Sequence, residues 1–107
     1  REDWIRRMKR RWDNAPTVAE WEKRLVKKFP SLLQDKSYHI VQGAICRNLA
    51  YCQLLSGRTQ LARKEVIKYS KYLTNDSIGK LMKLTKSTLL SWWLLCKFLK
   101  WREWHRK

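Results

Sequence analysis

The sequence predicts an all-α fold, a small bundle of five or six helices built on a central antiparallel helix hairpin. Apolar residues recur at helical spacing along the chain, and no segment alternates apolar and polar residues as a strand would. The stretch 40–73 carries the hairpin, with its turn at residues 56–59. We expect a single domain over residues 1–107, which is long enough for one modest core.

The two arms of the hairpin differ in pattern. The first arm is apolar on nearly every side, as is typical of a buried helix. Gly57 favours a C-terminal cap because glycine enters the left-handed conformation without steric cost, and we expect Thr59 to cap the second arm. The second arm has one apolar stripe, formed by Ala62, Val66, Tyr69 and Leu73. Its other face carries Arg63, Lys64, Lys68 and Lys71.

Two shorter helices precede the hairpin. The first, 1–12, has an apolar face made of Trp4, Ile5, Met8 and Trp12. It ends before Pro16, and Thr17 with Glu20 forms a capping box for the second helix, which Pro30 ends. The apolar stripe of this second helix is Val18, Trp21, Leu25 and Phe29, and its basic face is Lys23, Arg24, Lys27 and Lys28. A turn of helix at residues 32–33 leads to Ser37, which we expect to cap the first arm.

Two helices follow the hairpin. We expect Asn75 or Asp76 to cap a short helix over 77–86, and Ser87 to cap the final helix. On the final helix we expect one set to face the bundle: Leu89, Leu90, Trp93 and Cys96. We expect Trp92, Leu95 and Leu99 to flank that set. The last part, 97–107, is basic.

The charge balance indicates an anionic partner. The net charge is +16, from 25 Lys and Arg against 9 Asp and Glu. Nucleic acid, anionic lipid and an acidic neighbouring domain all fit such a surplus. The predicted anion-binding residues are Lys23, Arg24, Lys27, Lys28, Arg63, Lys64, Lys68, Lys71, Lys97, Lys100, Arg102, Arg106 and Lys107.

Tryptophan is the second unusual feature, with seven in the chain. The apolar run 89–99 is shorter than the ~20 residues that span a bilayer. An amphipathic helix with tryptophan and basic residues can instead lie in the headgroup region. The membrane-interface candidates are Trp92, Trp93, Trp101 and Trp104, and the alternative for each is a place in the core.

The sequence offers no pattern for catalysis, a metal or a cofactor, and we expect none. General acid–base chemistry uses paired carboxylates or a histidine with a partner, whereas His39 and His105 are far apart. Zinc sites need clustered Cys and His, but Cys46 and Cys52 are six residues apart on one predicted helix. Three cysteines without a disulfide pattern favour a reducing compartment. We therefore expect a cytoplasmic protein, with peripheral attachment to the inner face of the plasma membrane if lipid is the partner.

The hairpin resembles two known patterns. Leu49, Ala50, Gly57, Ala62 and Val66 are spaced like the small and apolar positions of a tetratricopeptide helix pair. The stretch 49–63, with its apolar helix, glycine turn and Ala-Arg pair, also resembles the helical C-terminal tail of bacterial family 2 glycosyltransferases of the GT-A type. The run 84–99, rich in Leu and Trp before a basic end, is similar to the way such tails finish.

This resemblance implies an accessory domain rather than the catalytic one. The family's Asp-any-Asp metal motif is absent, because Asp3, Asp13, Asp35 and Asp76 are far apart. The chain begins at Arg1, so we expect a C-terminal fragment of a longer protein. Its partners would be an upstream catalytic domain and an anionic membrane surface or glycan acceptor. The alternatives are a basic nucleic-acid-binding module and a tetratricopeptide-like protein-interaction module.

Overall fold

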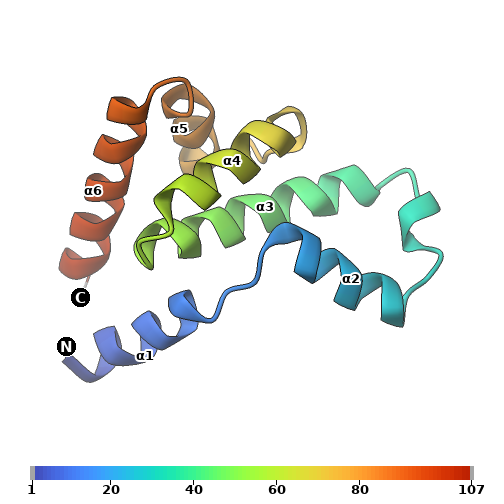
Figure 1. Ribbon diagram of the computed structural model, residues 1–107, viewed down its shortest axis with the longest axis horizontal. Helices are drawn as coiled ribbons and strands as arrows, with labels where there is room; N and C mark the ends of the chain where they lie inside the picture. Colours follow the sequence, from blue (N-terminus) through green and yellow to red (C-terminus); the bar gives the residue numbers. More distant parts are fainter. Residues whose placement is uncertain (1, 107) are drawn as a thin grey trace.

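The structure is a computed structural model that describes residues 2–106, and it confirms the all-α prediction. The described residues form six α-helices and two short 3-10 helices, and they contain no strand. The elements are α1 (Glu2–Asp13), α2 (Val18–Lys28), η1 (Leu32–Gln34), α3 (Tyr38–Leu55), α4 (Thr59–Tyr69), η2 (Ser70–Tyr72), α5 (Ser77–Thr85) and α6 (Leu89–His105). In Figure 1, α3 runs through the middle, α1 and α2 lie on one side of it, and α6 stands at the end where both termini lie.

The helices α3 and α4 form the predicted hairpin. At its turn, Gly57 has a positive φ of 87°. The Arg58 N–H donates to the Gln53 carbonyl at 2.8 Å, and the Gly57 N–H donates to the Leu54 carbonyl at 3.3 Å. This pair of bonds is the Schellman motif, in which a left-handed residue closes the end of a helix. The expected cap at Gly57 is therefore confirmed.

The core surrounds α3. This helix contacts α1, α2, α4, α6 and both 3-10 helices. Gly43 allows one of these approaches, because a Cβ at this position would overlap the carbonyl group of Tyr72 in η2. In the first turn of α3, Ile40 is 72% and Val41 39% exposed, so the expected burial of these two residues is wrong. The buried apolar residues around α3 include Val18, Cys46, Ala50, Leu54, Ala62, Val66, Met82, Trp92 and Leu99.

The predicted helix starts are partly confirmed. Thr17 and Glu20 form the capping box of α2, and the Asp76 carboxylate accepts the Gly79 N–H of α5 at 2.9 Å. The final helix starts one residue later than expected, because Thr88 rather than Ser87 accepts the Ser91 N–H, at 3.1 Å.

Three other terminal predictions are wrong. Thr59 is the first residue of α4 rather than its cap, because α4 follows directly from the turn and Arg58 takes the N-cap position. Ser37 precedes α3 with helical backbone angles, and its side chain makes no capping bond. Phe29 follows the last helical residue of α2 and leaves the apolar stripe, so its side chain is exposed.

Candidate functional site

The most distinctive surface of the described residues is the outward side of α6. Seven of their fourteen exposed large apolar side chains lie on this one helix. We call this set the α6 outer face: Leu89, Leu90, Trp93, Leu94, Phe98, Trp101 and Trp104. Trp93 is 52% exposed, Trp101 59% and Leu90 68%. Contiguous apolar surface of this kind marks a binding site more often than isolated exposed residues do.

The inward side of α6 fixes the rotation of the helix. Trp92 is 1% exposed, and its Nε1 donates to the carbonyl oxygen of Thr59 at 2.7 Å. The Cys96 thiol reaches the carbonyl oxygen of Leu54 at 3.4 Å. The residues buried on this side are Trp92, Leu95, Cys96, Leu99 and Glu103.

The expected rotation of α6 is therefore wrong. Leu89, Leu90 and Trp93 point away from the bundle, and Trp92 belongs to the core rather than to an interface. The helix is apolar around most of its circumference, so its sequence has no polar face that would set its orientation. The bonds that Trp92, Cys96 and Glu103 make to other helices, together with core packing, determine which side is covered.

Cations lie within and beside the α6 outer face. The Lys97 Nζ lies 5.4 Å from the centroid of the Trp93 ring, a cation–π contact. Helical spacing places Lys100 and Arg102 on opposite flanks, between the buried side and the outer face. Arg106 pairs with Glu103 at 3.1 Å. The predicted site residue Lys107 lies outside the described residues.

The outer face continues into a hollow beside α5. This hollow is lined mainly by apolar groups from the two helices: Leu81, Thr85, Ser91, Leu94, Leu95 and Phe98. Phe98 stacks on Trp101, with ring centroids 6.4 Å apart, and Trp101 lies 4.8 Å from the ring of His105. The aromatic row and the hollow together form one extended, exposed apolar surface on α6.

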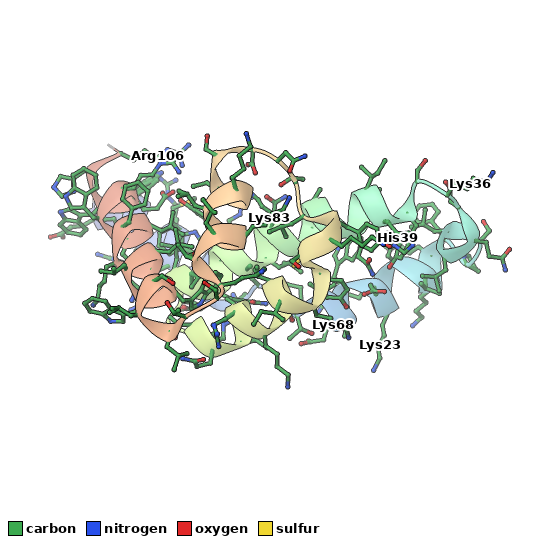
Figure 2. The ribbon with its side chains drawn as sticks, turned by 90° about the horizontal axis from the view of Figure 1, so that it is seen from above. Lys23, Lys36, His39, Lys68, Lys83 and Arg106 are labelled. Atoms are coloured by element: carbon green, nitrogen blue, oxygen red, sulfur yellow. The ribbon has the colours of Figure 1, made fainter. Side chains whose placement is uncertain are left out.

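The basic residues of α2 and α4 form a second charged region. Tyr69 donates to Glu22 at 3.2 Å, which joins the end of α4 to α2. Their sequence neighbours, Lys23 on α2 and Lys68 on α4, are labelled in the view from above (Figure 2). All but one of the predicted cations here are exposed: Lys23, Arg24, Lys27, Lys28, Lys64, Lys68 and Lys71. The exception is Arg63, whose half-buried guanidinium donates to the carbonyl of Lys86 at 2.8 Å and so ties α4 to the end of α5.

Buried polar groups hold the helices together. Glu22 also accepts the hydroxyl of Tyr38 at 2.7 Å. Burial and these bonds to Glu22 raise the pKa of Tyr69 to about 12 and that of Tyr38 further. Both phenols are therefore neutral donors near pH 7, which suits a structural tie rather than proton transfer.

The remaining chemically reactive side chains are structural or exposed. Burial raises the pKa of Cys46 to about 12, so its thiol stays protonated. His39 stacks on Tyr72 with ring centroids 4.3 Å apart, and the Nδ1 of His105 lies 2.9 Å from the carbonyl of Trp101. Within residues 2–106, no cluster of three or more His, Cys, Asp or Glu could hold a metal ion.

One grouping of cations was not predicted from the sequence, although Arg106 itself was among the predicted anion-binding residues. Arg11, Arg47 and Arg106 line a cleft between α1, α3 and α6. These arginines come from three helices and lie far apart in the chain, so no local spacing indicates that they meet.

Comparisons with protein-family models, curated proteins and solved structures find no match to this chain. None of the helices within residues 2–106 has the length and apolar character needed to cross a bilayer.

Proposed function

We propose that this domain is a non-catalytic membrane-docking module, the C-terminal helical domain of a bacterial glycosyltransferase. It positions an upstream catalytic domain at an anionic membrane surface or near its glycan acceptor. The observation that carries the proposal is the α6 outer face, an exposed apolar and tryptophan-rich surface flanked by cations.

The geometry suits a helix lying in the plane of the headgroups. With 17 residues, α6 is about 25 Å long, so its outer face can lie flat on a membrane. Tryptophan favours this depth because its ring is apolar and its N–H binds polar groups. Each half-exposed Trp or Leu side chain that leaves water contributes on the order of 1 kcal/mol. Lys97, Lys100 and Arg102 each add about 1 kcal/mol near anionic lipid.

The hairpin supports the glycosyltransferase part of the proposal through its resemblance to family 2 tails. Three residues of that pattern have clear roles in this fold. Ala50 and Ala62 are fully buried where α3 and α4 meet, and Gly57 closes the turn between them. The same pattern would hold the hairpin in a tail domain, leaving α6 free to dock.

Vesicle flotation tests the membrane proposal. The chain should float with phosphatidylserine-containing vesicles at low salt, and not with phosphatidylcholine alone. The double variant Trp93→Ser/Trp101→Ser should bind about tenfold more weakly, because two interfacial anchors are lost. The matched control is Phe29→Ser/Ile40→Ser, which removes two exposed apolar side chains from the end of α2 and the start of α3. Those ends of the two helices lie away from α6 (Figure 1). Absent flotation, or equal loss in both variants, would contradict the proposal.

Nucleic acid is the second candidate partner. It is favoured by the exposed cations of α2 and α4, since only two salt bridges occur among the described residues. These cations follow two helices rather than one recognition helix, which suits phosphate contacts without base reading. Titration with single-stranded and duplex DNA at several salt concentrations tests it. Salt-dependent binding that Lys23→Gln/Lys68→Gln weakens would favour this candidate over lipid.

A tetratricopeptide-like interaction module is a weaker alternative. The hairpin is covered by other helices, with α1, α2 and α6 packed on α3 and with α5 and α6 packed on α4. An apolar hollow does remain between α5 and α6. If the α6 outer face proves inert toward vesicles, a protein partner at this hollow becomes the better explanation.

A further inference from the structure

The cleft between α1, α3 and α6 has the composition of an anion site. Its walls combine arginine with aromatic side chains. The residues that carry the argument are Trp4, Arg11, Trp12, Arg47, Tyr51 and Arg106. No residue of the α6 outer face lines this cleft, because α6 contributes to it through the buried Glu103 and through Arg106 beyond its last turn.

The positive charge in the cleft is only partly neutralised. Glu103 is the one carboxylate in the lining, and it accepts the Tyr51 hydroxyl and pairs with Arg106. Arg47 pairs with Asp76 at 2.9 Å, on the side of α5. Arg11 is exposed and is in neither of the two salt bridges found among residues 2–106. Three cations therefore meet two carboxylates, and only one of these lies in the cleft.

The two weakly acidic side chains of the cleft, Tyr51 and Cys52, add no negative charge near pH 7. Burial and the bond to Glu103 raise the pKa of Tyr51, so its phenol remains protonated. Burial likewise raises the pKa of Cys52, although the positive charges of Arg11, Arg58 and Arg47 oppose that rise.

We propose that this cleft binds a phosphate monoester. Arginine presents planar N–H groups that match phosphate oxygens. A ligand with two negative charges, such as a phosphate monoester, matches three arginines better than a ligand with one carboxylate does. The rings of Trp4 and Trp12 provide an apolar wall for the organic part of the ligand. The same chemistry occurs in a soluble phosphorylated metabolite and in the headgroup of a phosphomonoester lipid.

Titration with glycerol 3-phosphate, followed by tryptophan fluorescence and calorimetry, tests this site. Saturable binding should occur, and glycerol should give none. The variant Arg11→Gln/Arg106→Gln should weaken binding at least about tenfold, since each charge-assisted bond contributes substantially. Both side chains are exposed, although Arg106→Gln also removes the ion-pair partner of the buried Glu103, so circular dichroism verifies the fold of this variant. The control Arg24→Gln/Lys28→Gln makes the same change in charge on α2 and should leave affinity within about twofold.

Vesicles of phosphatidic acid or of phosphatidylserine, mixed with phosphatidylcholine, separate the two sources of ligand. A preference for phosphatidic acid that Arg11→Gln/Arg106→Gln removes would assign the site to a lipid headgroup. Binding of glycerol 3-phosphate without that preference would assign it to a soluble phosphomonoester. Absence of saturable binding in both arms, or equal weakening in the two double variants, would overturn the proposal. The test of the membrane proposal is independent of this one, because vesicle flotation of the chain is expected to depend on Trp93 and Trp101.

Discussion

Helices α3 and α6 have similar apolar patterns but different surroundings. Both are long, and both are apolar around most of their circumference. Neighbours cover α3 on most sides, from α1 and α2 to α4 and α6. In contrast, α6 packs on α3, α4 and α5 with one side only, and its outer face is open.

This difference shows what an all-round apolar pattern means. In α3 the fold itself accounts for most of the apolar surface, because other helices of the chain bury it everywhere but at Ile40 and Val41 among the large apolar residues. In α6 the fold accounts for only the side of Trp92 and Leu99. Leu90, Trp93 and Trp101 on the other side are exposed and lie outside the buried core, so a partner is the simplest reason for them.

The largest expected effect contrasts two adjacent tryptophans on α6. Trp92→Ala should lower the free energy of unfolding by about 3–5 kcal/mol, because it empties a core position. It also leaves the Thr59 carbonyl without its indole donor. Trp93→Ala should change stability by only about 0.5 kcal/mol, since this ring is half exposed. Urea unfolding followed by circular dichroism measures both, and similar losses would remove the distinction between the two sides of α6.

A second contrast concerns the close packing around α3. Gly43→Ala should cost about 3 kcal/mol, because the added methyl overlaps the backbone of Tyr72. Gly57→Ala meets no neighbouring atom and should cost only about 1 kcal/mol, through its positive φ. Thermal and urea unfolding of both variants would check the order. If Gly57→Ala proved the more damaging, α3 would be less tightly covered than the structure indicates.

A third prediction concerns Asp76, which caps α5 and pairs with Arg47 on α3. Burial acts to raise the pKa of Asp76, but bonds from Gly79, Thr74 and Arg47 outweigh it and hold the pKa below the ordinary 3.8. Its stabilising effect is therefore present above pH 3.8 and is lost as pH falls through the lowered pKa. Asp76→Ala should cost about 1 kcal/mol near neutral pH.

Unfolding curves at several pH values test this prediction. Asp76→Asn is the matched control, because asparagine keeps the cap and loses only the charge. Its stability should fall less with acid than that of the unmodified chain. An identical acid dependence in the two proteins would show that the ion pair with Arg47 contributes nothing measurable.

The smallest expected effect comes from Glu65. Its contribution to stability changes with pH in the direction opposite to that of Asp76. Burial raises the pKa of Glu65 above the ordinary 4.5, although bonds from the Val18 N–H and from Gln53 partly offset it. The folded state thus holds this proton more tightly than the unfolded state. Stability should fall as pH rises from 4.5 through the raised pKa. Glu65→Gln should flatten that part of the stability profile, and an unchanged slope would place its cause elsewhere.

The hairpin could be predicted because its sequence specifies both a turn and an orientation. Gly57 marks the turn, and the one-sided stripe containing Ala62 and Val66 shows which side of α4 is buried. Side chains that bond within three residues, such as Thr17 and Asp76, were predictable for the same local reason. Three predicted caps were wrong. Ser87 and Thr59 lie one residue away from the observed N-cap, and the side chain of Ser37 makes no capping bond.

The rotation of α6 and the arginine cleft could not be predicted. Apolar residues surround α6, so the covered side depends on distant partners such as the Thr59 carbonyl. The cleft depends on α1, α3 and α6 meeting, and Arg11 and Arg106 are 95 positions apart in the numbering. In both cases the information lies in tertiary contacts rather than in local spacing.

Tryptophan fluorescence with vesicles tests the central claim, that the α6 outer face docks on anionic membranes. The unmodified chain should show a blue shift with phosphatidylserine vesicles, reduced by salt, and none with phosphatidylcholine alone. The variant Trp93→Phe/Trp101→Phe retains the apolar surface but should lose most of that shift, because the reporting rings at the interface are gone. A chain that shows no shift with anionic vesicles, or a variant whose shift equals that of the unmodified chain, would contradict the claim.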